Sequence, residues 1–221
     1  MASDKDMKGV ASNVRLIKLL TDVSNKDPEN SFLLNLYKRE DKFTPESLVQ
    51  ELREDASNTI LRPFKGSPNY DEVVRMVAEK IGVDKKDLTE DEAENELLII
   101  RKMLQDYLKK HPEEEEKLNE LVKEMGEEYN DLVSLIFKGS ASAFLAAIDA
   151  IGPIIIFRIL LTFAGVQAAF MAARIAALLV PFLNIFMSAW LVVSIAGPAY
   201  RKIVPSVIDI ALLRLQQKQE N

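Results

Sequence analysis

The chain has no cysteine among its 221 residues and only one histidine, His111. Without cysteine it can form no disulfide, no thiolate nucleophile and no zinc–thiolate site. A metal site would have to consist of carboxylates, and the acidic run at 113–116 is more typical of the solvated first turn of a helix. No motif for nucleotide binding, acyl transfer or phosphoryl transfer is present. We therefore expect no catalytic residue, metal or cofactor, and interpret the chain as non-enzymatic.

Glycine and proline are scarce, with 8 and 9 residues, and no segment shows the sustained alternation of a strand. Apolar residues recur at helical spacing almost throughout. This pattern predicts an all-α fold, a multi-helix bundle whose N-terminal half is amphipathic. Signals for helix ends support it: Thr44 before Pro45, a capping-box spacing at Asn69 and Glu72, a second one at Thr89 and Glu92, and a stop at Gly82.

Charge is distributed unevenly. Residues 1–138 carry 22 basic and 31 acidic side chains, whereas residues 139–221 carry 6 and 3. The contrast divides the chain into a charged amphipathic region at 1–138 and an apolar region at 139–221, which could also form one integrated domain. The acidic first region argues against nucleic acid as a partner, because phosphate binding requires a basic face.

The second region is almost free of charge between Gly139 and Tyr200. Breaks at Gly152-Pro153, Pro181 and Gly197-Pro198 divide it into expected helices near 140–150, 154–179, 182–196 and 203–217. The helices at 154–179 and 182–196 would form a strongly apolar hairpin. They are too short or too interrupted to be routine membrane spans, but too apolar for an aqueous surface.

Three charges interrupt the apolar stretch: Asp149, Arg158 and Arg174. A buried charge needs a partner or a route to water. Asp149 could therefore pair with Arg158 or Arg174, or each charge could lie at a helix end and reach solvent.

Small residues recur every four positions along the first hairpin helix, at Gly165, Ala169, Ala173 and Ala177. Such a ridge allows two helix backbones to approach closely. Association of helices in lipid and close packing in a water-soluble core both fit the pattern.

The end of the chain resembles the C-terminal signature of the YaaW family of small, uncharacterised bacterial proteins. The matching elements are Ala199-Tyr200-Arg201, Pro205 and the helix from Val207 to Arg214 with its Val-x-x-Ile-Ala-x-Leu-Arg pattern. The region of about 58–98 is also similar. The resemblance implies an all-helical fold and importance for Tyr200, Arg201 and Pro205, but no activity; some members carry a ubiquinol–cytochrome c chaperone label.

The residues of this signature also have a physical interpretation. Pro205 suits the first turn of the last helix, and Tyr200 suits a boundary between water and an apolar layer. Arg201 would precede the helix, where a cation opposes the helix dipole. We therefore expect Arg201 to bond an acidic residue or a helix C-terminal carbonyl of this protein, or alternatively a lipid headgroup.

The combined pattern predicts a non-enzymatic helical protein that associates with membrane lipid or a protein partner through the apolar hairpin at 154–196. Lipid-triggered or pore-forming action is the sharper form of this hypothesis. The alternative is a soluble assembly chaperone or an oligomeric scaffold, with a homo-oligomer as one form. The expected location is the cytoplasm, peripheral to or inserted at the inner face of the cytoplasmic membrane, because no signal-peptide pattern opens the sequence.

Overall fold

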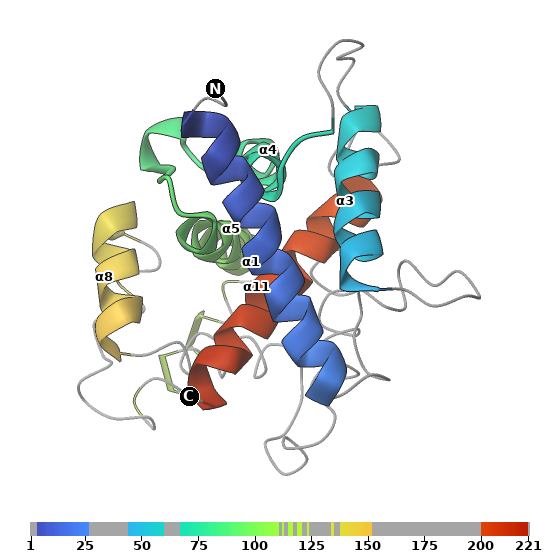
Figure 1. The fold of residues 1–221 in the computed structure, drawn as a ribbon. Helices are drawn as coiled ribbons and strands as arrows, with labels where there is room; N and C mark the ends of the chain where they lie inside the picture. Colours follow the sequence, from blue (N-terminus) through green and yellow to red (C-terminus); the bar gives the residue numbers. More distant parts are fainter. Residues whose placement is uncertain are drawn as a thin grey trace.

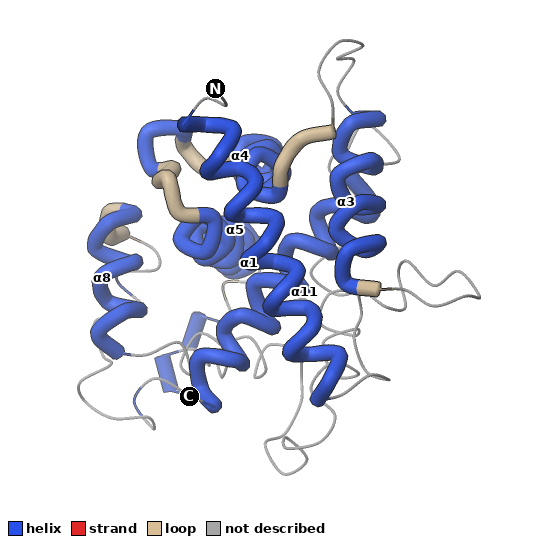
Figure 2. The backbone as a smooth tube through the Cα atoms, viewed as in Figure 1, coloured by secondary structure: helices blue, strands red, loops and turns tan. Residues whose placement is uncertain are grey.

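The computed structural model describes residues 4–26, 44–59, 67–110, 138–151 and 200–220, with isolated positions between 112 and 134. Within these ranges the chain is helical and contains no strand, which confirms the all-α prediction for this part (Figure 2). The helices are α1 (Asp4–Lys26), α3 (Pro45–Thr59), α4 (Tyr70–Ile81), α5 (Glu92–Lys110), α8 (Ala141–Ile151) and α11 (Tyr200–Glu220), with a short 3₁₀ turn η1 (Lys85–Asp87).

The last helix lies in the middle of the bundle. Figure 1 shows α1 crossing in front of α11, α3 on one side and α8 set apart on the other. Helix α11 contacts α1, α3, α4 and α5, whereas α8 packs against α5. Every residue from Ile203 to Leu213 is buried, as expected for a helix that other helices surround. The segment that follows the apolar stretch therefore completes the core of the charged region.

Two predicted helix ends are confirmed. Helix α3 begins at Pro45, and Thr44 and Ser47 cap it reciprocally: the Ser47 amide donates to Thr44 Oγ1 at 3.3 Å and the Thr44 amide to Ser47 Oγ at 3.0 Å. Helix α4 ends at Gly82, whose φ of 91° is left-handed. The amide of the next residue, Val83, returns to the Ala78 carbonyl at 2.9 Å, which completes a Schellman-type end.

The start of α4 is held both by its own sequence and by α1. The Glu72 carboxylate accepts the Asn69 amide at 3.2 Å, as the capping-box spacing predicts. Asn13 of α1 donates to Asn69 Oδ1 at 2.8 Å and accepts the Tyr70 amide at 2.9 Å. Gly9 lies one turn before Asn13 and brings α1 close, since a Cβ at Gly9 would lie 2.2 Å from Asn69 Nδ2.

The predicted cap at Thr89 is wrong, because α5 begins at Glu92 and the capping side chain is Asp91. Asp91 Oδ1 accepts the Ala93 amide at 2.8 Å. Thr89 instead pairs with Asn95: its amide donates to Asn95 Oδ1 at 2.9 Å, and its carbonyl accepts from Asn95 Nδ2 at 3.0 Å. The Thr89 hydroxyl accepts the Asp91 amide at 3.2 Å, so it bonds a residue before the helix rather than an amide of the first turn.

The start of α11 also differs from expectation. The helix begins at Tyr200, so Arg201 lies within its first turn rather than before it, and Pro205 lies inside the helix. Proline has no backbone N–H, so the helix lacks one backbone hydrogen bond at this position. Ser206 Oγ donates to the Lys202 carbonyl at 2.7 Å in this part of the helix.

The predicted hairpin at 154–196 lies outside the described residues. The same is true of Arg158, Arg174 and the ridge at Gly165, Ala169, Ala173 and Ala177. In the part of the chain that the structure describes, no helix is both long enough and apolar enough to cross a membrane.

Candidate functional site

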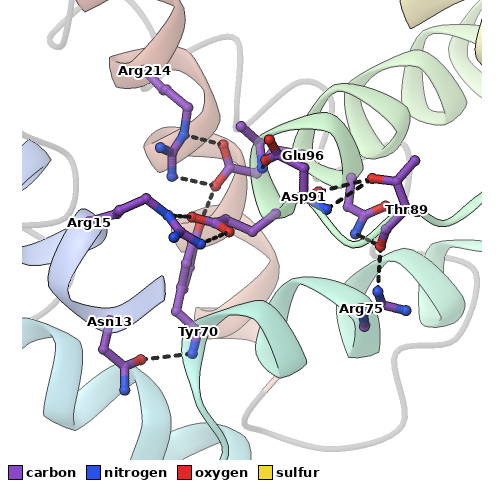
Figure 3. A network of polar contacts seen from close by, with 11 residues as sticks. Asn13, Arg15, Tyr70, Arg75, Thr89, Asp91, Glu96 and Arg214 are labelled. Atoms are coloured by element: carbon purple, nitrogen blue, oxygen red, sulfur yellow. Dashed lines mark hydrogen bonds and ion pairs between the residues drawn. The ribbon is translucent and has the colours of Figure 1, made fainter. Parts of the chain in front are cut away.

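The central polar group of the described core is Glu96 on α5, which is 1% exposed and accepts three hydrogen bonds (Figure 3). Arg214 of α11 donates from Nε to Oε2 at 2.9 Å and from Nη2 to Oε1 at 3.2 Å. The Tyr70 hydroxyl donates to Oε1 at 2.7 Å. Two side chains from distant parts of the sequence therefore hold one carboxylate on a third helix.

A second ion pair lies one turn earlier on α5. Arg15 of α1 donates from Nε and Nη2 to the two carboxylate oxygens of Glu92, at 2.6 and 2.5 Å. Glu92 is buried, while about half of the Arg15 side chain is exposed. Because Glu92 and Glu96 are four residues apart, they lie on one face of α5. Two carboxylates and two guanidinium groups thus meet there with balanced charge.

Burial and pairing act in opposite directions on this network. Burial raises the pKa of Glu96, and the charge of Arg214 offsets this only in part. Burial also raises the pKa of Tyr70 well above its usual value, and the Glu96 charge adds to the effect. Tyr70 is therefore a neutral hydrogen-bond donor. Burial alone would lower the pKa of Arg214, but the Glu96 carboxylate outweighs it and raises that pKa, so Arg214 remains cationic.

Glu92 shows the opposite balance from Glu96. Burial would raise its pKa, but the hydrogen bonds from Arg15, a backbone hydrogen bond and the charges of Arg15 and Arg214 together outweigh burial, and the pKa of Glu92 is lowered. The difference follows from position, since Glu96 is at the centre of the bundle and Glu92 is near its edge. The network therefore contains one carboxyl group with a raised pKa, Glu96, and one with a lowered pKa, Glu92.

The arrangement acts as a clamp between helices. Its groups come from α1, α4, α5 and α11, and each buried charge has an oppositely charged partner. Two clefts beside α5 and α8 are lined by other residues, and Tyr70, Glu96 and Arg214 are not among them. The geometry therefore fixes α11 against the earlier helices.

A separate contact anchors α8 to α5. Arg101, 8% exposed, donates from Nη2 to the Gly139 carbonyl, and its guanidinium lies 5.3 Å from the centre of the Phe144 ring. Burial lowers the pKa of Arg101. Ser140 caps α8, since its Oγ accepts the Ala143 amide at 3.1 Å. One arginine thus holds the turn that opens the apolar region.

The start of α11 has contacts of its own. Lys202 Nζ lies 3.3 Å from Asp55 Oδ2 on α3. The Lys80 ammonium of α4 lies 5.3 Å from the centre of the Tyr200 ring. Burial raises the pKa of Tyr200, and the charge of Glu79 adds to it. Both ends of α11 are therefore connected to other helices of the bundle.

Two clefts border the contact between α5 and α8. The larger, about 890 Å³, is lined by apolar residues such as Leu97 and Leu145 and by the acidic side chains of Asp87, Asp91 and Glu94. The smaller, about 430 Å³, lies beside Arg101. Among the described residues, no group of three or more histidine, aspartate or glutamate side chains is placed to hold a metal ion.

The residues predicted from sequence fall into three groups. Tyr200 is half-buried where α11 meets α4. Arg201, Pro205 and Asp149 are placed on helices, but the side chains of Arg201 and Asp149 are not described, so their expected pairings stay predictions. The remaining predicted residues lie outside the described ranges.

Sequence reasoning missed the clamp. Arg214 was named only as the last residue of the helix that resembles the YaaW family, and neither Glu96 nor Tyr70 was predicted to be important. A usable signal was present, because Glu96 interrupts the apolar face of α5 and Arg214 interrupts that of α11. A charged residue within an apolar helical face needs a partner. The sequence does not show which partner that is.

Comparisons with protein-family models, curated proteins and solved structures found no match to this chain. The resemblance to the YaaW family therefore stays a prediction.

Proposed function

We propose that this chain is a non-enzymatic helical protein that associates with a membrane through its apolar segment at 154–196. The helical body holds that segment at both ends. The proposed location is the cytoplasmic face of the membrane, and lipid-triggered insertion is the sharper form of the proposal. The observation that supports it most is the attachment of both flanks of the apolar segment to one body.

The two flanks are attached independently. Before the segment, Arg101 holds the Gly139 carbonyl and the Phe144 ring of α8. After it, Lys202 pairs with Asp55 and Arg214 pairs with Glu96. The stretch between Gly139 and Tyr200, with only three formal charges, thus begins and ends at helices that are attached to the charged helical bundle.

The composition of the segment then favours lipid over water. Burial of apolar surface contributes roughly 25 cal/mol per Å², so helices that are apolar on all sides require a cover. The apolar region also has a basic excess, with 6 basic and 3 acidic residues at 139–221. Basic residues beside an apolar segment suit an anionic lipid surface.

The test is flotation of the full chain, purified without detergent, with anionic vesicles, together with carbonate extraction from cells. The informative variant is Phe163→Asp/Phe170→Asp, because each acidic residue in a lipid-facing helix costs about 2.5–3.5 kcal/mol. Ser142→Asp is the control, since it adds a carboxylate at an exposed position in the first turn of α8. We expect the wild type and the control to float with the vesicles and the double variant to remain in the bottom fraction.

A monodisperse soluble monomer that ignores anionic vesicles would overturn the proposal. Defined oligomers that ignore vesicles would favour the scaffold function instead. In that case Ala169→Leu/Ala173→Leu should disrupt the oligomer, because overpacking a close helix contact typically costs about 1–3 kcal/mol. Leakage of a dye from vesicles would support the pore-forming form of the proposal.

A further inference from the structure

Helix α1 is apolar on two opposite faces. One face, which includes Leu16 and Leu19, is buried in the bundle. The other carries Met7, Val10 and Val14, whose side chains are 58%, 58% and 59% exposed. Helix α1 crosses the front of the bundle in Figure 1, so this second face points away from the other described helices.

The exposed residues have the spacing of a helix-pairing seam. Met7, Val10 and Val14, followed by the partly buried Ile17, alternate at intervals of three and four residues. This is the a and d spacing of a heptad, which faces one partner helix. A narrow seam of this kind suits a helix better than a lipid surface, because helices that lie on membranes carry a wide apolar face.

Charges beside the seam indicate which helix fits. On the flank next to it, the positions at heptad spacing are Asp4, Ala11 and Lys18, acidic, neutral and basic in that order. If a second α1 lies antiparallel with Val10 opposite Val14, Met7 lies opposite Ile17. In this register position 4 of each copy comes within two residues, about 3 Å along the helix axis, of position 18 of the other.

The other nearby charges and the parallel arrangement do not offer this match. Lys8 and Arg15 are engaged with Glu90 and Glu92 of their own chain. A parallel pair would bring no acidic position of this flank beside a basic one. Asn13, on the opposite flank, is bonded to Asn69 within the same chain.

We propose that α1 is a self-association surface, on which a second copy of this chain pairs antiparallel along Met7, Val10, Val14 and Ile17. Such an interface is isologous, so every contact occurs twice about a two-fold axis. The seam is smaller than a standard interface of about 1,600 Å². We therefore expect a weak dimer that forms only at high protein concentration. This surface is separate from the apolar segment at 154–196 and does not depend on the proposed membrane function.

Charge reversal provides the sharpest test. Asp4→Lys alone places lysine beside lysine at both ends of the dimer, and Lys18→Asp alone places aspartate beside aspartate. From the small energy of exposed ion pairs, we expect each single variant to weaken dimerisation by about tenfold in sedimentation equilibrium. The double variant Asp4→Lys/Lys18→Asp should restore it. An equimolar mixture of the two single variants should also restore it, by forming heterodimers.

A second pair of variants separates the seam from the charges. Val10→Gln/Val14→Gln should abolish the dimer and leave thermal stability intact, because both side chains are already exposed. Thr21→Gln, on the same helix beyond the last contact, is the control and should dimerise as the wild type does. A wild type that is monomeric at all concentrations, or single reversals whose mixture fails to recover, would overturn the proposal. If the wild type formed no dimer and the glutamine variant lost vesicle binding, the self-association proposal would also be overturned, and the exposed face of α1 would be a lipid-binding surface.

Discussion

Arg214 and Glu96 lie 118 residues apart in the sequence, yet they share two hydrogen bonds, and only 18% and 1% of their side chains are exposed. The pair joins the last helix to the middle of the charged region across the whole apolar stretch. A buried pair of this kind contributes little net stability over an apolar pair of the same shape, but breaking it on one side is costly. The pair therefore makes the position of α11 sensitive to a single substitution.

Arg214→Met should lower the free energy of unfolding by about 3–5 kcal/mol, because it leaves Glu96 buried without its cation. Urea denaturation followed by circular dichroism measures this change. Arg214→Lys retains the charge but loses the two-bond geometry, so its loss should be smaller.

The double variant Glu96→Gln/Arg214→Met is the control for charge. It removes both charges and keeps an oxygen acceptor for the Tyr70 hydroxyl, so it should be more stable than Arg214→Met alone. If Arg214→Met cost less than the double variant, the buried charge would not be the cause of the loss.

Glu92 should make the protein lose stability in acid. Its pKa is lowered in the folded chain because its hydrogen bonds and the nearby arginine charges together outweigh burial. The unfolded chain therefore binds more protons than the folded chain between the folded pKa and the ordinary value of 4.5. The stabilisation is complete above that ordinary value and is lost as the pH falls through the folded pKa. Glu92→Gln should flatten the fall in unfolding free energy below pH 4.5, as measured by urea titrations at several pH values.

Glu96→Gln should change the pH profile with the opposite sign. Because the pKa of Glu96 is raised in the folded chain, its contribution to stability is present below its unfolded pKa and decreases as the pH rises through the folded pKa. The variant should remove that decrease. Identical profiles for the two glutamine variants would contradict the opposite assignments of the two carboxylates.

Local signals in the sequence predicted the local structure well. The caps at Thr44 and Asn69 and the left-handed end at Gly82 each depend on residues within a few positions of one another. The start of α5 was misassigned by two residues, because the Thr89 hydroxyl bonds the Asp91 amide and Asp91 takes the capping role by accepting the Ala93 amide. The start of α11 was placed too late because a proline is usual in the first turn, whereas Pro205 lies further inside the helix.

Long-range features could not be predicted in this way. The pairing of Glu96 with Arg214 depends on how α5 and α11 cross, and no spacing in the sequence encodes that crossing. The burial of α11 on all sides was not predicted, because it depends on the helices that surround it. The same limit applies to α1, whose two apolar faces can be told apart only when the bundle covers one of them.

Gly9→Ala should destabilise the protein although alanine favours helices. The added Cβ would lie 2.2 Å from Asn69 Nδ2 and 2.8 Å from Asn69 Cγ, and Asn69 is held by its bond to Asn13. The clash costs about 1–3 kcal/mol, against a gain of about 0.5–1 kcal/mol from replacing glycine. We expect a net loss of about 1 kcal/mol in thermal denaturation. In an Asn69→Ala background the same substitution should become stabilising, and a loss of equal size there would rule out the clash.

Arg101→Met should release α8 from α5. The substitution keeps an apolar stem but removes the donor to the Gly139 carbonyl and the cation over the Phe144 ring. A hydrogen bond to a charged group contributes about 1.5–3 kcal/mol, so the docked state should lose about that much. Phe144 is fully buried, so chymotrypsin can cut after it only when α8 has moved away. We expect the fragment that ends at Phe144, identified by mass spectrometry, to form at least tenfold faster, since about 1.4 kcal/mol changes an equilibrium tenfold. Lys109→Met, at an exposed position on the same helix, should leave the rate unchanged. Equal cleavage of the wild type and Arg101→Met would show that other contacts hold α8 in place.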